Sequence, residues 1–126
     1  MKILGIDYGR KKIGLAVSEG ILATPLTVIR ENQPLAALKK ICLDQQITEI
    51  VIGLPESGIV EEIKLFAKEL SAITGLKVAF QDETLTSRSA LAKMIAAGKK
   101  RQFRRQKEDA AAAALILESY LEEQHV

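Results

Sequence analysis

The first 29 residues alternate between apolar runs and short polar turns, a pattern that predicts three β-strands. We expect strands at about 2–7, 12–18 and 24–29, because isoleucine, leucine, valine and threonine dominate these runs. The connections between them are short, which is typical of an antiparallel meander. The chain is therefore expected to open as three neighbouring strands of one sheet.

The rest of the chain alternates helical and extended patterns. Apolar residues recur at helical spacing in four segments, and two nearly all-apolar runs between them have the length of buried strands. Proline and glycine mark several of the boundaries. In chain order, we expect a helix from Pro34, a strand at 47–52, a helix at 59–73 that Gly75 ends, a strand at 76–80, a helix ending at Gly98 and a helix beginning at Asp109.

This order of elements predicts an α/β fold. Three sequential strands followed by alternating helices and strands give a mixed five-stranded sheet, with a three-stranded antiparallel meander and two parallel strands, flanked by helices. The 126 residues fit a single domain, 1–126, with a hydrophobic core of its own.

Composition narrows the class of protein. Apolar residues make up 48% and charged residues 27%, as in ordinary globular proteins. No apolar run approaches the roughly 20 residues that span a bilayer, and Asp7 comes too early for a signal peptide. The single Cys42 can form neither an internal disulfide nor a metal-binding pair. We therefore expect a cytoplasmic protein that does not contact a membrane.

The net charge of +2 hides an asymmetry. Six of the 18 basic residues lie at 99–107, where there is no acid, which leaves 12 basic and 16 acidic residues elsewhere. We call residues 99–107 the basic segment. An acidic body with one basic segment indicates a localised contact with a polyanion.

Three acidic sites lie where core packing does not explain them. Asp7 ends the first predicted strand, Asp82 and Glu83 follow the strand at 76–80, and Asp109 opens the last predicted helix. In open sheets with helices, functional groups gather where strand ends meet helix starts. Carboxylates that converge there would form an oxygen cage for Mg²⁺ or Mn²⁺. Such ions can activate water and stabilise the departing oxygen of a phosphodiester.

Each acid also has a purely structural explanation. Asp7 can cap the turn that follows it, Glu83 can be solvent-exposed, and Asp109 can satisfy the free amides and dipole of a helix start. The basic segment immediately before Asp109 favours the functional interpretation, because positive charge beside a carboxylate cluster attracts a polyanion. The residues therefore predict a metal-dependent phosphodiester site.

Basic residues near these acids are expected to contact phosphates, which positions a nucleic acid without reading its sequence. The alternative for the basic segment is a solvated loop whose charge aids solubility. Lys11 fits an ordinary hairpin charge, and Arg88 can either hold a phosphate or pair with an acid. The candidate nucleic-acid-binding residues are Arg10, Lys12, Arg88, Lys99, Lys100, Arg101, Arg104, Arg105 and Lys107.

Four motifs, in register along nearly the whole chain, resemble the YqgF family of RNase H-like proteins, which are relatives of the RuvC Holliday junction resolvase. The motifs are GIDYG at 5–9 with IGLAVS at 13–18, IGLP at 52–55, DETLTS at 82–87, and Asp109 before the alanine run with LESYL at 117–121. The resemblance implies an RNase H-like fold with Asp7, Glu83 and Asp109 as metal-binding catalytic acids. It also implies a nuclease that matures the 5′ end of precursor 16S ribosomal RNA in the cytoplasm.

One departure from the family concerns the residues after Gly-Leu-Pro. The family usually has a longer loop there, with an asparagine and further glycines, whereas here ESGI at 56–59 leads straight into the predicted helix. Many RNase H-like nucleases place their second acid near this loop. Glu56 therefore stays a candidate beside Glu83.

Other functions remain open at the level of sequence, as does the oligomeric state. The same residues suit a Holliday junction resolvase-like DNA endonuclease, or a non-catalytic nucleic-acid-binding assembly factor. GIDYG with a return strand also resembles the phosphate-binding hairpin of sugar kinases. Those kinases close two such domains around a nucleotide, and 126 residues supply only one.

Overall fold

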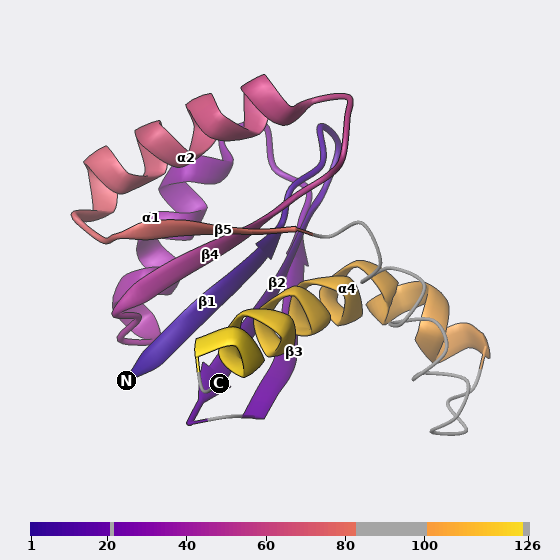
Figure 1. Cartoon of the computed structure of the whole chain (residues 1–126). Helices are drawn as coiled ribbons and strands as arrows, with labels where there is room; N and C mark the ends of the chain where they lie inside the picture. The colour runs from indigo at the N-terminus through magenta and orange to yellow at the C-terminus, as the bar shows by residue number, and fades with distance from the viewer. Residues whose placement is uncertain (21, 83–100, 125–126) are drawn as a thin grey trace.

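Five strands form one mixed sheet in the computed structural model, which describes residues 1–20, 22–82 and 101–124, with side chains from 110 to 123 in the last range (Figure 1). The strand order is β3-β2-β1-β4-β5. β1, β2 and β3 are antiparallel neighbours, while β4 runs parallel to β1 and β5 parallel to β4. This confirms the predicted meander with two parallel strands. The strands are β1 Lys2–Asp7, β2 Ile13–Glu19, β3 Leu22–Ile29, β4 Glu49–Leu54 and β5 Val78–Asp82.

Helices cover both faces of the sheet (Figure 1). α1, Pro34–Asp44, and α2, Val60–Thr74, lie on one face. α4, Arg101–Gln124, lies across β1, β2 and β3 on the other. The helix expected to end at Gly98 falls on residues 83–100 and so lies outside the described residues.

The core between the sheet and α1/α2 is built from branched aliphatic side chains. Leu4 and Ile6 of β1 are fully buried there against Leu38 of α1 and Leu70 of α2. Ile3 and Gly5 belong to the other face, because successive side chains in a strand alternate. β1 is therefore apolar almost throughout, as expected of a central strand covered on both faces.

A second core lies between the sheet and α4. Ala113 and Leu117 of α4 pack against Ile3 of β1 and Val51 of β4. At the closest approach, a Cβ added to Gly5 would lie 3.0 Å from the Ala113 carbonyl oxygen and 3.0 Å from the Leu117 Cβ. The alanine run of α4 and the glycine of β1 thus bring the helix backbone down onto the strand.

The second half of α4 lies over the beginning of the parallel strands. The Tyr120 hydroxyl donates a hydrogen bond of 2.7 Å to Glu49, the first residue of β4. Ala113, earlier in the helix, packs over Gly5 in the middle of β1. These two contacts show that α4 runs back across the sheet roughly opposite to β1 (Figure 1). Residues of α4 before Ala113 therefore lie toward the carboxyl end of β1.

Two predicted strands begin and end two residues later than expected. The strand predicted at 47–52 is Glu49–Leu54, because the Ile47 amide donates to the Cys42 carbonyl and so closes the end of α1. The strand predicted at 76–80 is Val78–Asp82, since β5 follows the register of β4. Both strands thus extend farther toward the edge at which Asp7 lies.

The prediction that Asp109 opens the last helix is wrong. α4 already includes Arg101, the first described residue of this part of the chain, so residues 101–107 of the basic segment are helical and not a loop. Arginine, lysine and glutamine favour helix, and neither glycine nor proline separates them from the alanine run. The helix therefore continues through them.

Two smaller expectations can be compared with the described residues. Cys42 is buried in the α1/α2 core, as predicted, and burial raises the pKa of its thiol. Among the residues whose structure is described, none of the helices is long and apolar enough to cross a membrane.

Candidate active site

The carboxyl ends of the three parallel strands meet at one edge of the sheet. β1 ends at Asp7, β4 at Leu54 and β5 at Asp82, and Leu54 pairs with Asp82 in the ladder. Asp7 is half-buried and shares the face of Gly5, which α4 covers. Functional groups of open α/β sheets collect at this kind of edge. The structure therefore places Asp7 where the sequence predicted it.

The turn after Asp7 is attached to α2 by Glu62. The Tyr8 hydroxyl donates to Glu62 Oε2 at 2.8 Å, and Arg10 Nε donates to Glu62 Oε1 at 3.0 Å. The Tyr8 ring also packs on Phe66 of α2, with ring centroids 4.7 Å apart. One carboxylate thus holds both sides of the turn and limits the movement of the backbone next to Asp7.

Gly9 is required for the shape of this turn. A Cβ at this position would lie 2.7 Å from the backbone oxygen of Lys12, well inside ordinary van der Waals contact. The second glycine of GIDYG is therefore required because a larger residue would clash with the turn.

The contacts of Glu62 change the acidity of the groups involved. Hydrogen bonds from Tyr8 and then Arg10 hold the pKa of the Glu62 carboxyl below its ordinary value. Burial, followed by the hydrogen bond to Glu62, raises the pKa of Tyr8 to about 12. Burial and the hydrogen bond to Glu49 likewise raise the pKa of Tyr120 to about 12. Both phenols are thus held neutral beside carboxylates.

These are the two tyrosines of a chain without tryptophan, which makes their titration directly observable. We expect no tyrosinate absorbance near pH 10 in the folded protein and a midpoint of about 12 for both phenols. Because the folded state binds these protons more tightly than the unfolded state, their contribution to stability is complete below pH 10. It is lost as pH rises toward 12. Ultraviolet titration in buffer and in concentrated urea measures the difference, and a folded midpoint near 10 would contradict these contacts.

The other two predicted acids are only partly covered by the structure. Glu83 lies outside the described residues, directly after Asp82, the last residue of β5. The backbone of residue 109 lies within α4, one turn before Ala113. Glu56 is exposed and follows β4 by two residues. In the described part of the chain, no three acidic, histidine or cysteine side chains come together as a metal-binding group.

The predicted basic residues divide into three groups. Arg10 and Lys12 are exposed in the turn after Asp7, and Arg10 is engaged with Glu62. Arg101, Arg104, Arg105 and Lys107 lie in α4, with their backbone alone described. Arg88, Lys99 and Lys100 lie outside the described residues.

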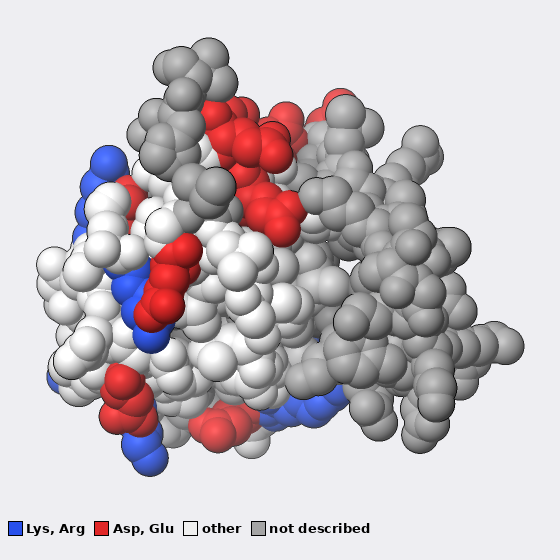
Figure 2. Space-filling model, turned by 90° about the horizontal axis from the view of Figure 1, so that it is seen from below, with Lys and Arg blue, Asp and Glu red and all other residues white. Residues whose placement is uncertain are grey.

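Charge on the face seen from below is mixed. Figure 2 shows the described acidic side chains of this face gathered mainly in one group, with lysines and arginines at separate places. For the described residues, this face therefore offers no continuous cationic surface.

Two features of the site were not predicted from the sequence. Glu62 gave no local signal, because its partners lie more than 50 positions away. Arg30 directly follows β3 at the same edge of the sheet and lines a pocket with the turn after Asp7. A basic residue immediately after a predicted strand was the available signal for Arg30.

Comparison with known proteins agrees with this fold. Residues 1–123 match the RuvX family, described as Holliday junction resolvase. A protein of Carboxydothermus hydrogenoformans named "Putative pre-16S rRNA nuclease" is 40% identical over 132 residues, covering 96% of each chain. The relationship thus extends over nearly the full length of both proteins.

Solved structures of lower identity show the same fold. Thermus thermophilus RuvC in complex with a Holliday junction substrate is 18% identical, with a TM-score of 0.62 over 99% of this chain and 96% of that one. The fowlpox virus Holliday junction resolvase is 13% identical, with a TM-score of 0.65 over 100% of both chains. These likenesses confirm the RNase H-like architecture. Together with the full-length match, they show that the chain belongs to the RuvX family, also called YqgF.

Proposed function

We propose that this protein is a divalent-metal-dependent nuclease that processes the 5′ end of precursor 16S ribosomal RNA. The observation that carries the proposal is the position of Asp7, half-buried at the carboxyl end of the central strand of an RNase H-like sheet. The RNA substrate is proposed because the Carboxydothermus hydrogenoformans relative is named for it. The whole of 1–126 would act as one nuclease domain in the cytoplasm.

Asp7, Glu83 and Asp109 are proposed as the metal-binding catalytic acids. Asp7 lies two residues beyond Gly5, or about 7 Å along the strand. Residue 109 lies four residues before Ala113, or about 6 Å along the helix. Because Gly5 and Ala113 are in contact and α4 runs roughly opposite to β1, both steps lead toward the same edge. This arrangement supports a site shared by Asp7 and Asp109.

Glu83 would approach from the third parallel strand. β5 lies two strands from β1, about 10 Å across the sheet. A glutamate directly after β5 has the longer of the two acidic side chains to reach back toward Asp7. Glu56, which follows β4 between them, stays an alternative for this position.

Carboxylate oxygens are the ligands that Mg²⁺ and Mn²⁺ prefer, so the proposed acids fit either ion. When bound, such ions activate the attacking water and stabilise the departing oxygen of a phosphodiester. The chain itself would hold the phosphate in place. Glu62 fixes the turn next to Asp7, and cations around this edge of the sheet would attract the phosphate backbone of the nucleic acid. The proposed phosphate contacts remain Arg10, Lys12, Arg88, Lys99, Lys100, Arg101, Arg104, Arg105 and Lys107.

Cleavage of Holliday junctions is the second candidate function. It is favoured by the description of the matching family and by the fold shared with a RuvC that binds such a junction. The two functions require the same acids and differ in the nucleic acid that reaches them.

A cleavage screen distinguishes these functions. Purified protein is incubated with Mg²⁺ or Mn²⁺ and with precursor 16S RNA, an unrelated single-stranded RNA and a four-way DNA junction. We expect cleavage of the precursor near the mature 5′ end, and no cleavage when EDTA is added. Preferential cutting of the junction would favour the second candidate. Binding of the precursor without cleavage of any substrate would instead identify a non-catalytic assembly factor.

A further inference from the structure

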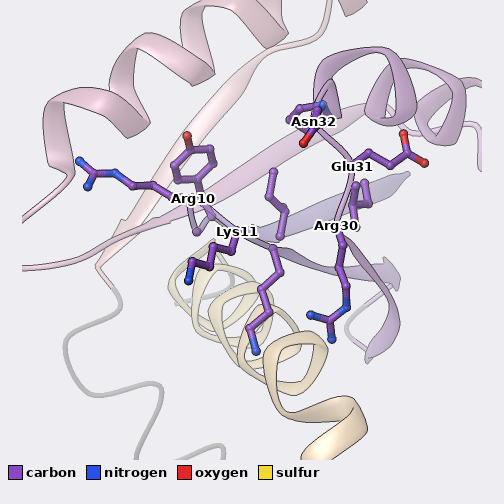
Figure 3. Close-up of a pocket in the computed structure, with 11 residues that line it drawn as sticks. Arg10, Lys11, Arg30, Glu31 and Asn32 are labelled. Carbon is purple, nitrogen blue, oxygen red and sulfur yellow. The ribbon is translucent and has the colours of Figure 1, made fainter.

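A pocket of about 420 Å³ lies between the turn after Asp7 and the connection from β3 to α1 (Figure 3). Residues 8–13 form one side, and Ile29 to Asn32 with Pro34 form the other. The ladder pair Ile13–Ile29 joins the two segments at their base. The pocket is therefore part of the folded sheet edge, formed by segments almost 20 positions apart.

The lining of this pocket concentrates positive charge. Residues 1–82 contain ten basic and ten acidic residues, so this part of the chain is neutral as a whole. Four of the ten basic residues line the pocket, with a single acid, Glu31. Arg10 is balanced by Glu62, whereas Lys11 and Arg30 are exposed cations of the same lining.

Two cations of this lining, Lys11 and Arg30, lie on opposite sides of the pocket. Beyond the last ladder pair, Ile13–Ile29, the next residues of the two segments are Lys12 and Arg30. Lys11 and Arg30 are exposed and make no ion pair or hydrogen bond within the described part of the chain. An anion between the two segments would neutralise the charges of Lys11 and Arg30.

The orientation of the side chains relates the pocket to Asp7. In Figure 3, Lys11 and Arg30 extend toward the side of the sheet on which α4 lies, whereas Arg10 extends toward α2. Asp7 faces the α4 side as well. It pairs with Gly14, next to Ile13, and β3 is two strands from β1, about 10 Å away. The cations thus lie beside the carboxyl end of β1, opposite to the side from which Glu83 would approach.

We propose that Lys11 and Arg30, with Lys12, bind a phosphate of the nucleic-acid strand that flanks the phosphodiester held at Asp7. Arg30 supplies a planar guanidinium that can bind two phosphate oxygens at once, and Lys11 supplies a point charge. The inference rests on the proposed nuclease function and extends the substrate along the β3 side of the sheet. It assigns binding to Lys11, which the sequence suggested to be an ordinary hairpin charge, and to Arg30.

The salt dependence of binding tests this site independently of cleavage. The double variant Lys11→Ala/Arg30→Ala is compared with Lys39→Ala/Lys40→Ala, which removes the same charge from exposed positions of α1. Affinity for a fluorescently labelled single-stranded RNA is measured in EDTA at several salt concentrations, and gels verify that the RNA stays intact. Cleavage with Mg²⁺ or Mn²⁺ is scored in separate reactions.

We expect the pocket variant to bind roughly tenfold more weakly at low salt, as for the loss of two exposed charge contacts. The slope of the logarithm of the binding constant against the logarithm of the salt concentration should fall in magnitude by about 1.4, or about 0.7 for each lost contact to a single strand. The α1 variant should keep the wild-type slope. Equal slopes for the two variants, or a wild type that does not bind the RNA, would overturn the inference. A wild type that binds with the expected slopes but cuts nothing would overturn the nuclease function and leave the phosphate site standing.

Discussion

Replacing Asp7 with asparagine is expected to lower metal-dependent cleavage by about three orders of magnitude while leaving the fold intact. Asparagine has nearly the same shape but carries no negative charge, so it can no longer neutralise a divalent ion. Metal ions contribute several kcal/mol to phosphodiester cleavage, and each 1.4 kcal/mol corresponds to a factor of about ten in rate. Asp7 is half-buried at the end of β1, with its backbone paired to Gly14, so the side chain can change without loss of the ladder.

Asp44→Asn is the matched control for this prediction. It makes the same chemical change at an exposed acid at the end of α1, far along the chain from the three proposed ligands. Cleavage rate, melting temperature and Mn²⁺ affinity are measured for both variants. Asp7→Asn should lose cleavage and weaken Mn²⁺ binding with little change in melting temperature, whereas Asp44→Asn should resemble the wild type. Cleavage by Asp7→Asn at the wild-type rate would exclude Asp7 from catalysis.

The sheet could be predicted because its signals are local. β1 was predicted at its observed bounds, since Asp7 and Gly9 end an apolar run. α2 ends as expected at Gly75, whose φ of 71° is the left-handed conformation that glycine tolerates at a helix end. The short connections between the first three strands predicted the antiparallel meander, and the alternation of helices and strands predicted the parallel pairs. Each of these inferences needed only neighbouring residues.

Features that depend on distant parts of the chain were harder to predict. The predicted start of the last helix was wrong because a run of arginines and lysines was taken for a loop, although these residues favour helix. Glu62 has no special neighbours in sequence, and its role arises when α2 packs beside the turn after Asp7. Arg30 gains its meaning from the pairing of β2 with β3. The acidic residues were recognisable by type, but their mutual placement depends on tertiary packing.

Gly5→Ala is expected to destabilise the protein by about 1–3 kcal/mol, the usual cost of overpacking a core. The new Cβ would lie 3.0 Å from the Ala113 carbonyl oxygen and 3.0 Å from the Leu117 Cβ, closer than the roughly 3.5–4.0 Å of favourable carbon contacts. Both contacts are to α4, and one is to its backbone, so a side-chain rotation cannot relieve them. The helix has to move away from the sheet. At about 4 °C for each kcal/mol in a domain of this size, the melting temperature should fall by about 4–12 °C.

Movement of α4 should also affect catalysis, because the helix carries Asp109 and β1 carries Asp7. Ile6→Val is the control: it removes a methylene from the adjacent residue of β1, which faces α1 and α2, at a cost of about 0.5–1.5 kcal/mol. Cleavage is measured well below both melting temperatures, so that each variant is fully folded. Gly5→Ala should then cut more slowly than Ile6→Val and require more metal for half-maximal rate. If the two variants cut equally well, the contact between Gly5 and α4 stabilises the fold without setting the distance between the proposed metal ligands.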